Sequence, residues 1–113
     1  MTGREQMLSE FVFIYTPLPS REAAETMAGA LVGRRLAACV NIYPGVRSVY
    51  EWKGELHTDE EAVAFIKTRR ELASEVMEAA RQLHPYELPA LLMLPVLDGN
   101  EDYLAWVRTQ TGA

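Results

Sequence analysis

The stretch that decides the fold reads LAACVNIYPGVRSVYEW over residues 36–52, then KG at 53–54 and LHTDEEAVAFIKT over 56–68. Residues 36–42 are almost all apolar, and beyond Pro44-Gly45 the side chains divide into two alternating faces, as in a β-strand. The Lys53-Gly54 pair suits a tight turn, and residues 56–68 alternate again. This stretch therefore predicts a long β-hairpin with a break at Pro44-Gly45.

The length of this hairpin predicts self-assembly. Residues 36–52 drawn straight would span roughly 55 Å at about 3.3 Å per residue, whereas a compact domain of this size has a diameter of roughly 34 Å. We therefore expect the hairpin to extend beyond the body of the domain. Its distal half carries Tyr50, Trp52 and Leu56, which a single chain would leave as exposed apolar surface. A homo-oligomer with these three residues in its interface is the expected remedy.

Five further elements flank the hairpin. They are a strand over residues 11–15, helices over 21–33 and 72–84, a strand over 88–96 and a C-terminal helix from residue 101. Pro17 ends the first strand, and Ser20 caps the first helix. Helical periodicity places Tyr103, Trp106 and Val107 on the buried face of the last helix. The order βαββαβα predicts an α/β sandwich of the split β-α-β, ferredoxin-like type with an added C-terminal helix.

Composition limits the class of protein. The chain has 113 residues, of which 49% are hydrophobic, and this is enough for one continuous core. We expect a single domain over residues 10–113 after a flexible segment at 1–9. The formal net charge of −5 repels phosphates and anionic lipids, so nucleic acid and membrane surfaces are not expected partners. The sequence shows no signal-peptide core and only one cysteine, Cys39, which predicts a cytoplasmic protein.

Two side chains, Cys39 and His84, are candidate metal ligands, and a third, His57, is not. Cys39 lies in an apolar run, where a thiol usually packs as a small hydrophobic residue, and the alternative role is a soft ligand for Cu(I). His84 precedes Pro85 and suits a C-terminal helix cap, or else a metal or anion ligand. His57 has no partner at the short spacing that zinc sites use.

Carboxylate and aromatic residues suggest two other sites. Asp59 and Glu61 fall on one face of a strand, where they either hold a hard divalent ion or form a solvated charge run. Glu61, Lys67, Tyr86 and Trp106 are candidates to line a ligand cleft between subunits. The sequence contains no Ser-His-Asp motif and no glycine-rich phosphate loop, so we predict no catalytic residues and no enzyme activity.

A family resemblance rests on five blocks of sequence. They are LAACVNI at 36–42, Ser48 with YEWKG at 50–54, Lys67-Thr68, HPYELP at 84–89, and Gly99-Asn100 with Tyr103 and Trp106. In this order and spacing, the blocks resemble the CutA family of divalent-cation tolerance proteins. The resemblance covers nearly the whole chain after Glu10.

The resemblance implies a ferredoxin-like trimer whose long hairpins pair across subunits, with a role in tolerance to copper and other divalent cations. Some members of the family are described as binding Cu(II) through a cysteine at the end of the first strand and a His-His pair before Pro-Tyr. In this chain those positions are Tyr15, Leu83 and His84, so His84 is the implied ligand. Cys39 matches the family's other cysteine and is the second candidate.

The combined prediction is a cytoplasmic homotrimer that requires no cofactor and binds copper or another divalent ion through His84 and Cys39. Two alternatives stay open. One is a trimeric signalling protein that holds a small anionic or nucleotide ligand near Lys67, Tyr86 and Trp106. The other is a non-catalytic scaffold whose aromatic residues anchor a partner protein.

Overall fold

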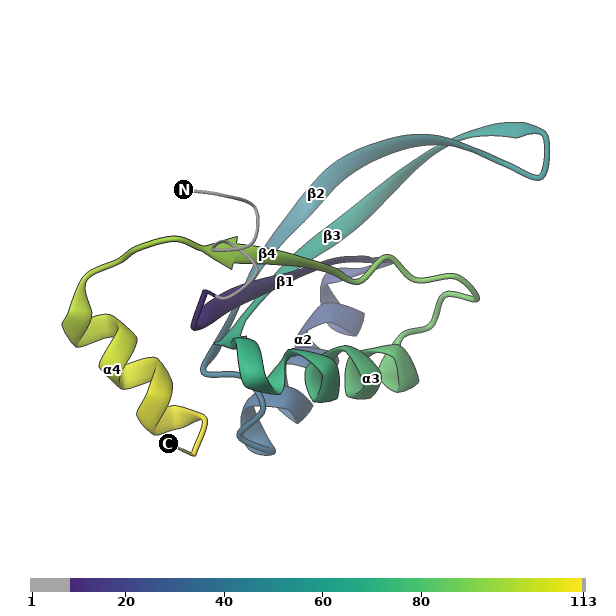
Figure 1. The fold of residues 1–113 in the computed structure, drawn as a ribbon. Coiled ribbons are helices and arrows are strands. Elements are labelled where there is room, and N and C mark those ends of the chain that lie inside the picture. Colours follow the sequence, from purple (N-terminus) through teal and green to yellow (C-terminus); the bar gives the residue numbers. More distant parts are fainter. Residues whose placement is uncertain (1–8, 113) are drawn as a thin grey trace.

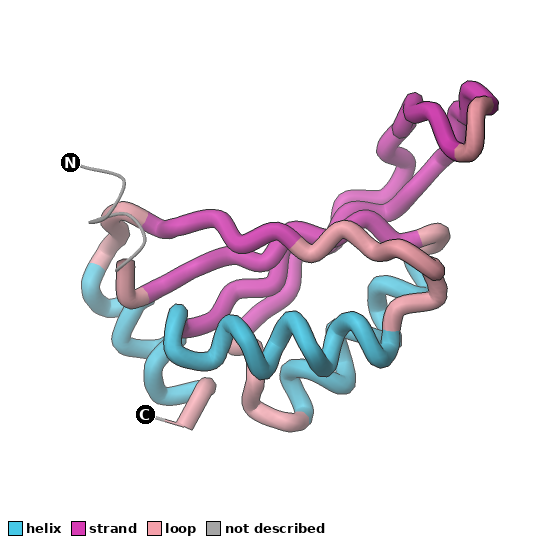
Figure 2. The backbone as a smooth tube through the Cα atoms, turned by 45° about the vertical axis from the view of Figure 1, so that its right-hand side comes forward, coloured by secondary structure: helices cyan, strands magenta, loops and turns pink. Residues whose placement is uncertain are grey.

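The computed structural model describes residues 9–112 as a four-stranded antiparallel sheet with helices against one face (Figures 1 and 2). The elements are β1 (Phe11–Leu18), α2 (Arg21–Gly33), β2 (Cys39–Trp52), β3 (Glu55–Arg69), a short 3-10 helix (Arg70–Leu72), α3 (Ala73–Leu83), β4 (Leu92–Val96) and α4 (Glu101–Gln110). The strand order is β2-β3-β1-β4. The predicted ferredoxin-like fold is confirmed, while the predicted flexible segment 1–9 lies, apart from Ser9, outside the described residues.

The β2–β3 hairpin projects from the body of the domain (Figures 1 and 2). Its turn is formed by Lys53 and Gly54, which both have positive φ angles, 52° and 83°, as a type I′ turn requires. The pairing register shifts between Tyr43 and Val46, at the predicted break. The chain measures 44 × 34 × 22 Å, so the predicted extension of the hairpin is confirmed.

The core lies between the sheet and helices α2 and α3. Alternate residues of β1 and β3, such as Ile14 and Ile66, are fully buried against Met27, Leu31 and Val76 of the helices. The Ser20 hydroxyl accepts a hydrogen bond from the Ala23 amide at 3.1 Å and starts α2 as expected. Burial of one sheet face and one stripe of each helix explains the two layers.

Three strand boundaries differ from the prediction by three residues or more. Strand β2 begins at Cys39 rather than at residue 36. Strand β1 continues to Leu18, because Pro17 pairs with Val63 of β3 and β4 does not reach this far along β1. A proline is tolerated where a strand has no neighbour on one side. Strand β4 begins at Leu92 rather than at residue 88, and the Pro17 carbonyl accepts a hydrogen bond from His84 instead of from a β4 residue.

Helix α4 lies at the end of the sheet rather than on either face (Figure 1). Only Val107 of this helix is fully buried, against Phe11 and Ala38. The Arg69 guanidinium holds the end of the helix through the Thr111 hydroxyl and carbonyl, at 2.8 and 2.7 Å. Trp106 is 41% exposed and Tyr103 is similar, so their predicted burial is wrong for the single chain. Within residues 9–112, no helix combines the length and apolar content needed to cross a membrane.

Candidate functional site

The sheet face opposite α2 and α3 carries a cluster of aromatic rings. Phe65 lies at its centre, with the ring centroids of Tyr15 and Tyr43 each 5.6 Å away and that of Phe13 6.5 Å away, in edge-to-face arrangements. Such pairs stabilise one another beyond simple burial. Tyr43 is nevertheless 56% exposed. These four residues, which we call the aromatic face, form an apolar surface that the described part of the chain covers only in part, since Phe13, Tyr15 and Phe65 are half-buried.

Strand β4 extends the aromatic face to the edge of the sheet. Leu94 pairs with Phe13 and Leu92 with Tyr15, so both leucines lie beside the rings. Leu92 is 55% exposed. Among the described residues β4 has no strand on its outer side, and an apolar edge with unpaired backbone groups is suited to pairing with another chain.

The three predicted interface residues lie on the projecting part of the hairpin. The Tyr50 ring stacks on His57 with centroids 5.4 Å apart, and its hydroxyl donates to Asp59. This hydrogen bond and partial burial raise the pKa of Tyr50. Trp52 lies on the same face as Tyr50, whereas Leu56, 77% exposed, faces the opposite side. All three are available to a partner, and their place in an interface stays a prediction.

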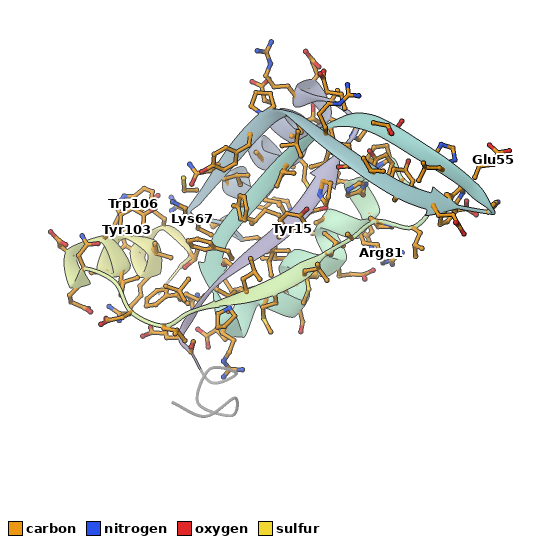
Figure 3. The ribbon with its side chains drawn as sticks, turned by 90° about the horizontal axis from the view of Figure 1, so that it is seen from above. Tyr15, Glu55, Lys67, Arg81, Tyr103 and Trp106 are labelled. Atoms are coloured by element: carbon orange, nitrogen blue, oxygen red, sulfur yellow. The ribbon has the colours of Figure 1, made fainter. Side chains whose placement is uncertain are left out.

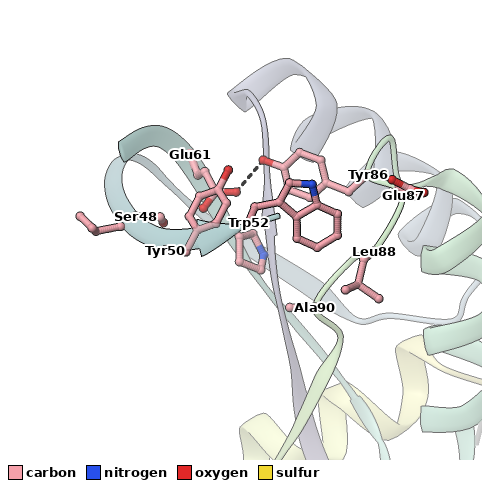
Figure 4. A pocket seen from close by; sticks show the side chains of 10 residues that line it. Ser48, Tyr50, Trp52, Glu61, Tyr86, Glu87, Leu88 and Ala90 are labelled. Atoms are coloured by element: carbon pink, nitrogen blue, oxygen red, sulfur yellow. Dashed lines mark hydrogen bonds between the residues drawn. The ribbon is translucent and has the colours of Figure 1, made fainter. Parts of the chain in front are cut away.

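A cleft of about 550 Å³ separates the hairpin from the loop between α3 and β4 (Figure 4). Tyr50, Trp52 and Glu61 line it from the hairpin, and Tyr86 and Leu88 from the loop. The Tyr86 hydroxyl donates to Glu61 Oε2 at 2.5 Å, which ties the loop to the hairpin. Burial, together with this hydrogen bond, raises the pKa of Tyr86, so its phenol stays protonated.

His84 joins the same loop to β1. Its Nε2 atom lies 2.8 Å from the Pro17 carbonyl oxygen and 3.1 Å from the Thr16 hydroxyl, and its Nδ1 atom accepts the Tyr86 amide at 3.2 Å. A carbonyl only accepts, so Nε2 carries the proton and the ring is neutral. The side chain is 8% exposed, and this burial lowers the pKa of His84 despite the opposing effects of the Pro17 carbonyl and Glu61.

The predicted copper ligands do not form a metal site within one chain. His84 has a lone pair only on Nδ1, and the Tyr86 amide already uses it. Cys39 is half-buried and pairs with Lys67, which is opposite Phe13, whereas His84 contacts Pro17, roughly 13 Å further along β1. No group of three His, Cys, Asp or Glu side chains in the described range is placed to hold a metal ion.

The two carboxylates considered as a site for a divalent ion, Asp59 and Glu61, are hydrogen-bonded to tyrosines. Each accepts a hydrogen bond from a phenol, Asp59 from Tyr50 and Glu61 from Tyr86. These contacts position aromatic rings at the cleft. The carboxylates therefore act here as structural acceptors.

The four residues predicted to line a ligand cleft lie in two separate places. Glu61 and Tyr86 meet at the hairpin cleft. Lys67 lies at the far end of the sheet, with its ammonium 5.4 Å from the Tyr103 ring and the Trp106 ring next to that of Tyr103 (Figure 3). The structure does not bring Lys67 and Trp106 to Tyr86 within one chain, and a cleft shared between subunits stays a prediction.

Sequence reasoning missed the aromatic face, although a signal for it was present. Residues 11–15, FVFIY, are apolar on both faces of the strand. Such a run is typical of a strand that is covered on both sides. Helices α2 and α3 cover one side only, so the same run predicts a partner on the other.

Comparison with known proteins places the chain among divalent-cation tolerance proteins. The family model of the CutA1 divalent ion tolerance protein matches residues 12–110. The divalent-cation tolerance protein CutA of Thermus thermophilus is 46% identical over 95 residues, which cover 84% of this chain and 92% of that protein. The human protein CutA is 42% identical over 97 residues, 86% of this chain. The match spans about half, 54%, of the human protein.

Solved structures show the same fold. CutA1 from Ehrlichia chaffeensis superposes with a TM-score of 0.89 at 28% identity, covering 94% of this chain and 99% of that one. The Thermus thermophilus protein gives 0.85 at 43% identity, over 90% and 99% of the two chains. A CutA from Archaeoglobus fulgidus, described as a periplasmic divalent cation tolerance protein, gives 0.86 at 35% identity, over 89% and 98%.

Proposed function

This chain belongs to the CutA1 divalent ion tolerance protein family, and from that premise we propose that it is a non-enzymatic protein of divalent-cation tolerance that works as a homotrimer. The observation that carries the proposal is the exposed aromatic face. A sheet normally buries each apolar face against another layer, and within residues 9–112 the helices α2 and α3 cover only the other face of this sheet. A neighbouring copy supplies that layer.

Exposed apolar residues at both edges of the sheet also favour covering of the aromatic face by another copy of the chain. Strands β2 and β4 are the outer strands, and exposed apolar side chains lie on each, with Leu92 on β4 and Trp52 on β2. A ring of identical copies buries both edges at once, because each copy offers its β2 edge to one neighbour and its β4 edge to the other. The family resemblance implies that the ring has three members.

We propose that divalent metal binds weakly and only to the assembled protein, since a metal ion at His84 has to displace the Tyr86 amide from Nδ1, and among the described residues neither His84 nor Cys39 belongs to a group of three metal-ligating side chains. In a native mass spectrum recorded during a Cu(II) titration, copper should appear on trimer ions and be lost in the His84→Asn and Cys39→Ser variants. His57→Asn serves as a matched histidine control. Trimer ions that stay free of copper, or copper retained by both variants, would contradict these ligands while leaving the assembly intact.

The role in tolerance is tested by growth. Expression of this chain in a host that lacks its own CutA protein should restore growth at copper or zinc concentrations that stop the parent strain. A variant that cannot assemble, such as Leu92→Asp, should not rescue, because tolerance is proposed to require the trimer. Full rescue by the unassembled variant would contradict that requirement.

We also propose a cytoplasmic location. The support is the single cysteine, which is free in the structure and is stable as a thiol in a reducing compartment. Fractionation of the cells used for the growth test should recover the protein with cytoplasmic markers. Recovery with periplasmic markers would contradict the cytoplasmic location.

A further inference from the structure

Charges are divided along the side of the sheet that carries the aromatic face. Alternation places the odd-numbered residues of β3 on this side. Lys67 lies at the end near α4, and the only other lysine or arginine on this side of β3, Arg69, is buried and holds the end of α4. The carboxylates of this side of β3 all lie on the hairpin, and Figure 3 shows one of them, Glu55, far from Lys67; the others are Asp59 and Glu61. The hairpin end of this surface is therefore acidic, and its opposite end carries a cation.

Lys67 has aromatic neighbours but no acidic partner among the described residues. Its ammonium lies 5.6 Å from the centroid of the Phe13 ring, 5.4 Å from that of the Tyr103 ring and 3.5 Å from the Tyr103 hydroxyl. The ion pairs formed within residues 9–112 all involve other side chains. A neighbouring copy that covers the aromatic face would take water from this ammonium, and a buried charge without an opposite charge is strongly destabilising. The covering layer therefore has to bring a carboxylate.

Of the three hairpin carboxylates, Glu61 is the one best prepared to pair with a cation from a neighbour. It is half-buried, whereas Glu55 and Asp59 are exposed. The Tyr86 hydroxyl holds its Oε2 atom, and no hydrogen bond within the described part of the chain uses Oε1. A side chain that is already held in place loses less conformational entropy when it binds. Glu61 therefore offers an ordered, partly dehydrated acceptor.

The distribution of charge also favours one way for two copies to meet. Two acidic hairpins placed face to face repel each other, whereas an acidic hairpin is attracted to the end of a neighbour that carries Lys67. Such a contact joins different parts of the two copies, and when it is repeated head to tail it can close into a ring. A symmetric dimer built by pairing the hairpins is disfavoured for the same reason.

We propose that Lys67 of each copy forms an ion pair with Glu61 of the next copy around the ring. This inference rests on the homotrimer proposed above and names a charge contact that fixes how its subunits meet. Within one chain the two residues are six positions apart on β3, or roughly 20 Å at about 3.3 Å per residue. They cannot pair in a monomer, so any energetic coupling between them has to cross a subunit boundary.

Neutral variants measure this coupling through the urea concentration at which the trimer dissociates, at one fixed protein concentration. Lys67→Gln and Glu61→Gln should each lower this midpoint by about 1 M or more, because each leaves the other charge buried and unpaired. The double variant should dissociate at a higher urea concentration than either single variant. Glu61→Gln keeps an acceptor for the Tyr86 hydroxyl, and Glu60→Gln, on the opposite face of β3, is the matched control and should leave the midpoint unchanged.

The outcomes separate the ion pair from the trimer. Losses that simply add in the double variant would overturn the ion pair and leave the trimer intact, since sites without contact behave additively. Coupling that persists in a Leu92→Asp monomer would overturn it as well, because the effect would then arise within one chain. A wild-type protein that is monomeric without urea would instead refute the homotrimer.

Charge reversal tests the head-to-tail arrangement. Lys67→Glu and Glu61→Lys should each prevent assembly, with the fold of the monomers checked by circular dichroism, and the double reversal in one chain should restore the trimer. An equal mixture of the two single variants should not restore it fully. A ring of three subunits of two kinds always contains a contact between like subunits, which here brings like charges together. A double reversal that stays monomeric, or a mixture that assembles as well as the double reversal, would overturn the proposal.

Discussion

The Leu92→Asp variant is expected to be monomeric, with a mass by light scattering about threefold lower than that of the assembled wild-type protein. Leu92 lies on the edge strand β4 beside Tyr15 and is 55% exposed in the single chain. A carboxylate at this position is solvated in the monomer, so the fold is retained. In an apolar interface the same carboxylate would lose its hydration without gaining a partner. We expect the free-energy cost of burying this charge to prevent assembly.

Val32→Asp is the matched control for this variant. Val32 is an exposed aliphatic residue on α2, 42% exposed, on the helical side of the molecule. The same change in charge there should leave the mass of the assembly unchanged. A Leu92→Asp protein that keeps the wild-type mass would show that the aromatic face and β4 do not form the interface.

The second large effect concerns His84 and pH. Because burial lowers the pKa of His84 in the folded protein below its ordinary value of 6.5, the unfolded chain takes up a proton at a higher pH than the folded chain does. The contribution of His84 to the free energy of unfolding is therefore fully present above about pH 6.5. It is lost as the pH falls from about 6.5 to the pKa of His84 in the folded protein, and it no longer changes below that pKa. Urea unfolding at a series of pH values and fixed protein concentration measures this dependence.

Replacing His84 removes both the buried ring and its hydrogen bonds. His84→Ala leaves the Thr16 hydroxyl and the Tyr86 amide without this partner and opens a cavity, so we expect a loss of about 3 kcal/mol at pH 8. The pH dependence below 6.5 should disappear with it. His57→Gln should retain the pH dependence, since His57 lies on the hairpin and stacks only on Tyr50. A wild-type stability that is constant between pH 8 and pH 5 would contradict the buried, neutral assignment of His84.

The elements of the fold were largely predictable because their signals are local. The Lys53-Gly54 turn, the Ser20 cap and the alternation of residues 56–68 each depend on near neighbours in the sequence. Pro17 misled the prediction of the end of the first strand, since a proline breaks a strand only where a neighbouring strand needs its amide. Whether it does depends on which strands pair, and this is set by contacts far along the chain.

The arrangement of the candidate site residues is set by contacts between residues that are far apart in the sequence. His84 was expected to cap a helix or bind a metal, and its amide does cap α3, donating to Arg81 at 3.3 Å. Its ring instead binds Thr16 and Pro17, 68 and 67 residues earlier in the chain. Lys67 and Tyr86 were predicted to share a cleft between subunits, and within one chain Lys67 lies beside Phe13 while Tyr86 is hydrogen-bonded to Glu61, further along β3. The sequence contains the residue types, and only the fold shows which of them meet.

The aromatic face was predictable in principle and connects the sequence with the assembly. The distal hairpin residues Tyr50, Trp52 and Leu56 predicted self-assembly from the sequence, whereas a second aromatic surface lies at the centre of the sheet around Phe65. Both observations call for a neighbouring copy. The exposed Trp106 on α4 is a third apolar group that a neighbour would cover.

A native mass spectrum of the unmodified protein tests whether the chain assembles into a trimer, because it counts subunits without assuming a shape. We expect ions at three times the 12.7 kDa mass of the chain, at low micromolar concentration and neutral pH. Ions at the mass of one chain alone would contradict it, since the aromatic face and the projecting hairpin would then be stable in water without a partner.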